Sequence, residues 1–526
     1  MAHSGKKNKK LLGNTLVAGT LLLTIAGLAT RMIGFFYRIY LSNALGAKLL
    51  GIYQLIFPVY GICFTIFASG IQTAISKQVA ERQAVRDTKA SRRFLFSGIT
   101  LSISLALLLS VLLFFSCQLV ARLFLREPEC AKSLRLLACA FPFCGITACI
   151  SGYCYGRKKS FLPATSQLVE QTVRVVFLMI AAGLWPVTCE LAISALVAGE
   201  IISCTYCIFG LFIIQHKEKK HLKNKIDPVN SHLTLTADLK KLVSISAPLT
   251  MNRLFINVLH SFESFLVPLT LRSFGLGRDE ALSIFGILSG MTMSFLMFPG
   301  TLTNSLSVLL LPTISEASAK NNQTGLAKAV ASSIKYSVLL GVFSGFFFFF
   351  FGEELGIVVF SEKRAGTYLA CLSFLCPILY VSTTLSSILN GLDKMNLTFL
   401  SSVLGLILRV VLFGILIPRL SVYGYFVSLL VSQLFMTLFD LALIHRYIAF
   451  SFDAVNTLIK PSIILLATAS FFFRMYEFLA VQTALPHLIL LALCAAAMTF
   501  CSFGLFAATG ILFRKKQNSA QLKTPA

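Results

Sequence analysis

The stretch that decides the fold class is Leu16–Tyr40, with the sequence LVAGTLLLTIAGLATRMIGFFYRIY. It exceeds the roughly 20 apolar residues that a helix needs to cross a membrane. Four lysines precede it, as in the first part of a secretory signal peptide: Lys6, Lys7, Lys9 and Lys10. Because a signal peptide has a shorter apolar core and many apolar runs follow here, we expect a retained membrane-spanning helix.

Apolar runs of similar length continue to the end of the chain. Of the 526 residues, 56% are hydrophobic and only 13% are charged, against about 25% charged in soluble domains. The mean hydropathy is +0.81, which excludes a soluble enzyme. The sequence predicts an all-α polytopic membrane protein with fourteen transmembrane helices, which start near Leu16, Leu49, Phe94, Leu134, Phe161, Leu191, Leu242, Leu282, Ala329, Tyr368, Leu397, Tyr423, Leu458 and His487.

The basic residues orient these spans. The chain has 46 Lys and Arg against 21 Asp and Glu. Loops on the side of the N-terminus hold 30 of the basic residues, and loops on the opposite side hold 10. Basic loops stay in the cytoplasm, so both termini are predicted to be cytoplasmic. We expect these loops to contact anionic lipids rather than nucleic acid.

Two segments 235 residues apart are similar. Between 142–180 and 377–415, ten of 39 positions are identical, among them Pro142 with Pro377 and Arg174 with Arg409. Matches of Pro, Gly, Lys and Arg are not explained by shared hydrophobicity. The sequence therefore contains an internal repeat, in which the fourth and fifth spans recur as the tenth and eleventh.

The repeat predicts two lobes. Six spans precede the polar, lysine-rich stretch 216–240 and six follow it. We predict six-helix lobes at 1–215 and 241–448, a cytoplasmic linker at 216–240, and helices 13 and 14 with a cytoplasmic tail at 449–526. An even number of crossings in each lobe relates the copies by a pseudo-two-fold axis along the membrane normal, an arrangement typical of alternating-access transporters.

Charged residues inside the spans are candidate functional groups, because each costs at least about 2.5 kcal/mol at mid-bilayer. Glu170 and Arg174 are one helical turn apart, in the order that favours an ion pair. Either this pair is structural or it lines the substrate path. Arg409 lacks such an acid, because Gly405 stands in place of Glu170, so an anion or another helix must neutralise it.

Two further arginines point to an anionic substrate. Arg31 and Arg253 lie in the first helix of each predicted lobe and have no carboxylate one turn away. Arginine binds phosphate through a planar, permanently charged fork. With Arg38 or Arg409, these residues suit a phosphate-bearing substrate, although a structural role stays open.

Other charged residues have separate interpretations. His260 and Glu263 are three residues apart and could carry a proton or a cation in a coupling step. Arg38, Asp440 and Arg474 lie near span ends, from which their side chains can reach the headgroups.

Motifs of ATP hydrolysis and metal catalysis are absent from the sequence. We therefore predict no catalytic residue, no metal site and no cofactor, and coupling to the membrane potential, Na⁺ or H⁺ instead of ATP. Six acidic residues on the outer side have no recognisable catalytic setting, namely Glu127, Glu129, Asp279, Glu280, Glu353 and Glu354.

Several motifs resemble those of a known family, the stage V sporulation protein B-like polysaccharide transporters. They are Thr30-Arg-Met-Ile-Gly-Phe35, Leu45-Gly-Ala47, Gly51-Ile-Tyr-Gln54, Phe57-Pro58, Gly70-Ile-Gln-Thr-Ala-Ile-Ser-Lys77, Val79-Ala-Glu81, Ser166-Gln-Leu-Val-Glu-Gln-Thr-Val-Arg174, Phe285-Gly-Ile-Leu-Ser-Gly290 and Leu311-Pro-Thr-Ile-Ser-Glu-Ala317. The family belongs to the multidrug/oligosaccharidyl-lipid/polysaccharide exporter superfamily. The resemblance implies two six-helix lobes around a central cavity and, as in the related lipid II flippases, two extra C-terminal helices.

The resemblance extends to some site residues. Arg31 matches the first arginine of the flippase helix-1 motif, whereas the second falls on Tyr37, one position before Arg38. Gln54 lies in one of the similar motifs. The flippase acid at the start of helix 2 has no counterpart near Ile52, and 283–311 contains no Lys or Arg to match the helix-8 arginine. These departures leave open which lipid-linked glycan is transported.

The predicted function is a flippase, sufficient as a monomer, that moves a polyprenyl-diphosphate-linked saccharide across the membrane. A peptidoglycan or spore-cortex precursor resembling lipid II is the expected substrate. A multidrug cation antiporter of the same superfamily is one alternative, and it would favour embedded carboxylates over arginines. A membrane glycosyltransferase or polymerase is another, and it would need catalytic acids at the membrane surface.

Overall fold

The computed structural model describes residues 2–85, 87–222, 235–319, 323–448, 450, 452–483 and 485–511. Across these ranges the regular elements are all helices and no strand is present, which confirms the predicted all-α class. Lipid offers no hydrogen-bond partner to backbone groups, so apolar spanning segments fold as helices that satisfy these groups internally.

The chain divides into two compact units. Unit 1 contains Met1–Gly290 and Ser402–Ser428, and unit 2 contains Met291–Ser401 and Leu429–Ala526. This division reflects local packing and does not test the lobes 1–215 and 241–448, which stay a prediction. Most of the predicted linker, 223–234, lies outside the described residues.

Unit 1 contains the first half of the chain and part of α15 and α16. Its helices up to Gly290 are α1 (Ala2–Phe64), the π-helix η1 (Thr65–Ser69), α2 (Gly70–Ala84), α3 (Thr88–Leu119), the π-helix η2 (Val120–Phe124), α4 (Cys130–Ala138), α5 (Phe141–Gly156), α6 (Phe161–Ala182), α7 (Cys189–Leu222), α8 (Leu235–Ser273) and α9 (Arg278–Gly286). The π-helix η3 (Ile287–Thr292) follows α9 and crosses the boundary between the units.

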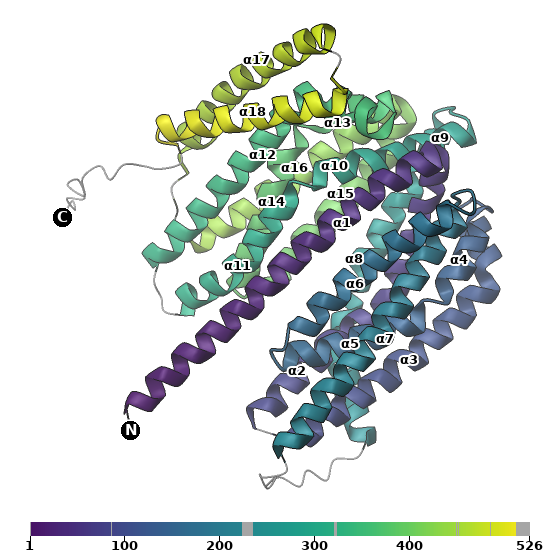
Figure 1. The fold of residues 1–526 in the computed structure, drawn as a ribbon, viewed down its shortest axis with the longest axis vertical. Helices are drawn as coiled ribbons and strands as arrows, with labels where there is room; N and C mark the ends of the chain where they lie inside the picture. Colours follow the sequence, from purple (N-terminus) through teal and green to yellow (C-terminus); the bar gives the residue numbers. More distant parts are fainter. Residues whose placement is uncertain are drawn as a thin grey trace. The chain divides into compact units, whose positions relative to one another are not determined.

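Unit 2 contains most of the remaining helices. They are α10 (Met293–Met297), α11 (Gly300–Ala319), α12 (Gln323–Phe360), α13 (Lys363–Leu372), α14 (Leu375–Gly391), the start of α15 (Met395–Leu420), most of α16 (Val422–Tyr447), the π-helix η4 (Val455–Ile459), α17 (Lys460–Gln482) and α18 (His487–Ala508). In this unit α17 and α18 lie side by side (Figure 1). Helix α17 also packs on α12. These are the two extra helices that the sequence predicts after the repeat.

The long helix α1 contains a break at Gly46, whose φ of 72° is unfavourable for other residues. The candidate span that contains it, Thr24–Ala84, has 61 residues. At 1.5 Å per residue this is about 90 Å, roughly three times the hydrocarbon thickness of a bilayer. The break therefore separates two crossings, as the sequence predicts.

By length and hydropathy, ten described helices can cross a membrane, or twelve if each of two bent helix pairs forms one span. This count is below the fourteen predicted. The difference has two sources. The two predicted crossings on either side of Gly46 count as one, and α6, the predicted fifth span, forms a helix of 22 residues that is not among the ten.

The backbone repeats its irregular features at the spacing found in the sequence. The bent pairs are α4 with α5, at 47°, and α13 with α14, at 60°. Positive φ angles occur at Lys158 and Asp393, and also at Arg126 and Ser361. Lys158 and Asp393 are 235 residues apart, and so are Arg126 and Ser361. The repeat therefore extends from sequence identity to the positions of bends and turns.

Unit 1 has a well-packed core. Buried apolar side chains of α2, α3, α5, α7 and α8 meet there, among them Ile75, Phe94, Tyr153 and Leu242. The turn between α8 and α9 brings α9 against α1 at Gly51 and Gly286. A Cβ atom at either glycine would collide with the backbone of the other helix. Glycine is thus required for this close approach.

Candidate functional site

A cavity of about 310 Å³ lies within unit 1. It is formed by α1, α2, α5, α6 and α7, and its lining is unusually polar for a membrane interior. The charged and amide side chains that line it are Gln72, Gln167, Glu170, Gln171, Arg174 and Glu200. Polar groups inside a membrane protein are costly, so their convergence marks this cavity as a candidate site.

The predicted ion pair on α6 lies in this cavity. Arg174 Nη2 is 2.6 Å from Glu170 Oε1, which confirms the contact predicted from their spacing. Glu200 of α7 lines the same space and is buried, and it accepts a hydrogen bond of 3.4 Å from the Tyr60 hydroxyl. The cavity thus holds two carboxylates and one guanidinium.

Two arginines that the sequence predicts to bind the substrate, Arg31 and Arg38, lie on α1. Arg31 and Arg38 are seven residues apart, which is two helical turns, and therefore share one face of the helix. Both are exposed, and Arg38 lies within electrostatic range of Arg174. Arg31 has neither an ion pair nor a hydrogen-bond partner among the described residues. One exposed guanidinium is thus available for an anion.

Arg253 lies in a different setting. Its Nη1 donates to the backbone oxygen and the hydroxyl oxygen of Ser69 in η1, at 2.8 and 2.6 Å. One turn further along α8, Asn257 donates to Thr65 at 2.5 Å. These polar side chains join α8 to the π-helix that interrupts the second span. Neither cavity described here is lined by Arg31 or Arg253.

Arg409 is neutralised by another helix. Its Nη1 lies 3.3 Å from Oε1 of Glu263 on α8, and both side chains are largely buried. Glu263 Oε2 is also 3.3 Å from His260 Nδ1, so these two residues are in contact, and their role in coupling stays a prediction. Of the two ways left open for neutralising Arg409, an anion or another helix, the structure has the helix.

Asp440 corrects one sequence interpretation. Its position near the end of a span predicts a side chain that reaches the headgroups, but it is only 1% exposed. The carboxylate lies 3.5 Å from the Ser386 hydroxyl of α14, inside unit 2. Packing of α16 in this unit, rather than depth along the helix, decides its environment.

The other predicted residues are placed more simply. Arg474 is 84% exposed and lies 3.7 Å from Glu477, in agreement with a surface position. Gln54 is half-buried on α1 and lines neither cavity. No group of three or more His, Cys, Asp or Glu side chains among the described residues could hold a metal ion.

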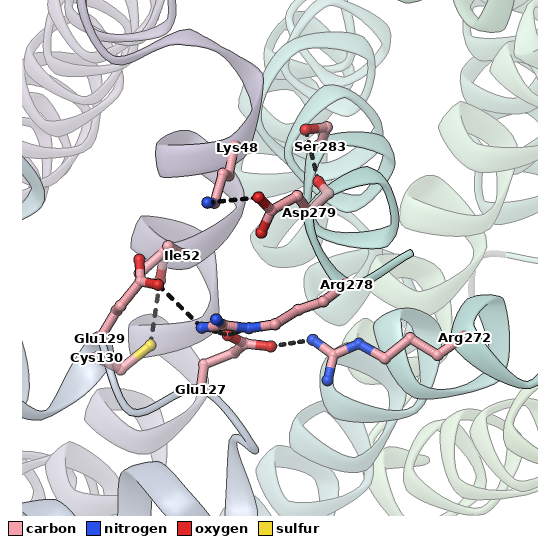
Figure 2. A network of polar contacts seen from close by, with 9 residues as sticks. All are labelled: Lys48, Ile52, Glu127, Glu129, Cys130, Arg272, Arg278, Asp279 and Ser283. Carbon is pink, nitrogen blue, oxygen red and sulfur yellow. Dashed lines mark hydrogen bonds and ion pairs between the residues drawn. The ribbon is translucent and has the colours of Figure 1, made fainter. Parts of the chain in front are cut away.

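A second polar network joins the turn between α8 and α9 to the start of the second span and to the α3–α4 connection (Figure 2). Glu127 is fully buried and pairs with both Arg272 and Arg278, and Arg278 also contacts Glu129 at 3.0 Å. Lys48 of α1 pairs with Asp279 at 2.9 Å. These residues are on the side that the sequence predicts to face outward.

Some contacts are not evident from the sequence. Glu200 is visible only as an acid within a span, without a sign that it shares a cavity with Glu170. Asn257 and Tyr60 carry no charge and give no signal. Their roles depend on which faces of distant helices meet.

Comparison with known proteins agrees with this architecture. A family described as "Polysaccharide biosynthesis protein" matches residues 16–318. Stage V sporulation protein B of Bacillus subtilis is 27% identical over 83% of this chain and 85% of its own length. Lipid II flippase MurJ of the same organism is 22% identical over 96% of this chain and 98% of its own length.

Solved structures show the same fold at low identity. A lipid II flippase MurJ in an inward closed conformation has a TM-score of 0.64 at 14% identity, covering 93% of this chain and 99% of its own. An inward-facing multidrug resistance MATE family transporter has a TM-score of 0.62 at 14% identity, covering 82% of this chain and 98% of its own. The chain therefore has the fold that these transporters share.

Proposed function

This chain belongs to the polysaccharide biosynthesis protein family, and from that premise we propose that it is a flippase for a polyprenyl-diphosphate-linked saccharide. The substrate would be a precursor of peptidoglycan or spore cortex, similar to lipid II. Transport would proceed by alternating access in a bacterial cytoplasmic membrane, with both termini in the cytoplasm and a monomer sufficient for function.

Arg31 is the observation that carries this proposal. It is exposed within an apolar segment and unpaired among the described residues. A guanidinium in such a setting is costly unless an anion neutralises it or water solvates it. A diphosphate offers charge and fork-shaped acceptors in the geometry that arginine prefers. Arg38, two turns along the same face, provides a second contact.

The neighbouring cavity suits the saccharide. Its glutamines, serines and carboxylates can exchange hydrogen bonds with sugar hydroxyls, while the lipid tail remains in the bilayer. Of the other predicted contacts, Gln54 lies on α1 and Arg409 is already paired with Glu263. We keep Arg253 as a contact through those of its nitrogens that Ser69 does not bind.

We also propose that the embedded acids couple transport to the membrane potential, Na⁺ or H⁺. Glu170 and Glu200 share one cavity with Arg174, and a third carboxylate, Glu263, contacts His260. A change in the charge of such clusters alters the energy of a conformation in which they are buried. The sequence contains no ATP-binding motif that would supply an alternative energy source.

The experiment that tests the proposal measures flipping of a fluorescent lipid II analogue in proteoliposomes. Arg31→Ala should abolish transport, because it removes the unpaired guanidinium. Arg474→Ala is the matched control, since Arg474 is also on a candidate spanning helix but is 84% exposed at its surface. Both variants should give wild-type yields of folded protein. Undiminished flipping by Arg31→Ala would contradict the proposal.

A multidrug cation antiporter is the second candidate. The fold shared with a MATE transporter and the two carboxylates of the cavity favour it. Cells that express the protein would then export a cationic dye, and Glu170→Gln with Glu200→Gln would stop that export. Dye export together with failure to move lipid II would favour this candidate over the flippase.

An enzyme acting on the same lipid is less well supported. The outer acids Glu127, Glu129 and Asp279 are held in ion pairs with arginine and lysine. Glu353 pairs with Lys363, and Glu354 accepts a hydrogen bond from Tyr476. A general acid or base must reach its substrate, which these pairings oppose. Formation of polymer from lipid II by the purified protein would support the enzyme.

A further inference from the structure

The structure contains a second cavity in unit 1, also of about 310 Å³, which we name the outer groove. It is formed by the end of η2 and the residues after it, by α8, and by Val410 of α15. Its apolar wall on α8 includes Phe262, Phe265, Leu266 and Leu269, spaced as one helical face. Its two charged lining residues are Arg126 and Arg272.

The groove combines an apolar wall with a basic end. Arg272 is three residues after Leu269 on α8, so it lies at the end of the apolar face. Arg126 comes from the α3–α4 connection, where a φ of 53° sets its backbone in the left-handed region. A molecule with a long hydrocarbon chain next to a phosphate group would place its chain against the apolar wall and its phosphate at the two arginines.

The charges at this end do not cancel. Arg272 and Arg278 are balanced by Glu127 and Glu129 through direct ion pairs (Figure 2). Arg126 is exposed and pairs with no other residue in the part of the chain that the structure describes. Among these five side chains one positive charge is therefore left over, and it matches the single negative charge of a phosphodiester headgroup.

The location is also unusual for basic residues. In the predicted topology this end of the spans faces outward, where basic residues are few. Yet the α3–α4 region holds four of the ten outer basic residues: Arg122, Arg126, Lys132 and Arg135. Such a concentration attracts anionic lipid headgroups at the membrane surface.

We propose that the outer groove binds one anionic phospholipid, such as phosphatidylglycerol. Its phosphate contacts Arg126 and the Arg272 side chain, and one acyl chain lies against Phe262, Phe265 and Leu266. Because Arg272 also holds buried Glu127, the lipid touches the network that joins α8 and α9 to the first helices. This site is separate from the polar cavity, and its occupancy does not depend on the transported substrate.

The test uses the full-length protein purified in detergent, with lipid binding followed by native mass spectrometry and by the thermal unfolding midpoint. Phosphatidylglycerol should bind and raise the midpoint, whereas phosphatidylcholine and inorganic phosphate should not. Arg126→Gln should weaken phosphatidylglycerol binding about fivefold, the usual effect of one basic residue near a membrane surface.

Two further variants distinguish the effect of charge on lipid binding from the effect of the shape of the groove. Leu266→Trp fills the groove without changing charge and should also weaken binding. Lys132→Gln removes an exposed charge from the same outer region but outside the groove, and should bind as the wild type does.

The proposal is overturned if phosphatidylcholine or inorganic phosphate stabilises the protein equally, or if Arg126→Gln and Lys132→Gln have equal effects. It is also overturned if Leu266→Trp leaves binding unchanged while the protein remains folded.

Discussion

The two copies of the internal repeat each contain a buried arginine, but they neutralise it with different partners. The α5–α6 and α14–α15 segments share a proline near the helix start, a turn with positive φ and the sequence Arg-Val-Val. In the first copy, Arg174 is neutralised by Glu170 on its own helix, at 2.6 Å. In the second copy Gly405 replaces the acid, and Arg409 is neutralised by Glu263, which is 146 residues away in the sequence.

The arginine is therefore present in both copies of the repeat, whereas the acid that neutralises it lies on a different helix in each copy. Both guanidinium groups are mostly buried, with exposed fractions of 13% and 11%. A charge at that depth requires a counter-charge, but the counter-charge can come from any helix that packs alongside. The carboxylate has a further partner in each copy: Glu263 also contacts His260, and Glu170 also accepts a hydrogen bond of 3.5 Å from Gln171.

The largest expected effect comes from removing the distant partner. Glu263→Gln leaves Arg409 buried without its carboxylate, and we expect a loss of about 3 kcal/mol in the free energy of unfolding, as for other broken buried pairs. Thermal unfolding in detergent measures it. Arg474→Gln, which alters an exposed pair, is the control and should change stability by less than about 0.5 kcal/mol. A similarly small change for Glu263→Gln would mean that Arg409 finds another partner.

A smaller effect is expected from the first copy. Glu170→Gln removes the ion pair with Arg174, but the side chain keeps its shape and can still accept a hydrogen bond, and Glu200 lines the same cavity. We expect a loss of about 1.5 kcal/mol, typical of a hydrogen bond to a charged group. The same unfolding measurement checks it. A loss larger than that of Glu263→Gln would reverse the proposed order of the two copies.

The smallest expected effect comes from building the local ion pair of the first copy into the second copy. In the Glu263→Gln background, Gly405→Glu places an acid one turn before Arg409, as in the first copy. Relative to Gly405→Gln, which adds the same bulk without charge, it should recover about 0.5 kcal/mol. A double-mutant cycle measures this coupling. If the two Gly405 variants are equally stable, the local pair of the first copy cannot be transferred to the second.

The sequence by itself determined the class of the protein, the repeat and the local charge pairs. Apolar run length predicts helices, and a spacing of three or four residues predicts Glu170 with Arg174 and His260 with Glu263. These properties depend on the geometry of a single helix, so the tertiary structure is not needed to find them. Pro142 and Pro377, which match in the repeat, lie in the second helix of each bent pair, but the bends themselves were found only in the structure.

Only the tertiary structure decided which helices meet. It brought Glu263 to Arg409 and Ser69 to Arg253, placed Glu200 beside Glu170, and buried Asp440 where a position near the membrane surface was expected. The physical reason is that hydrophobicity is nearly the same on all sides of a membrane helix, because lipid and protein neighbours are equally apolar. Sequence pattern therefore fixes how deep a residue lies along the helix, but contacts between helices depend on the close packing of particular faces.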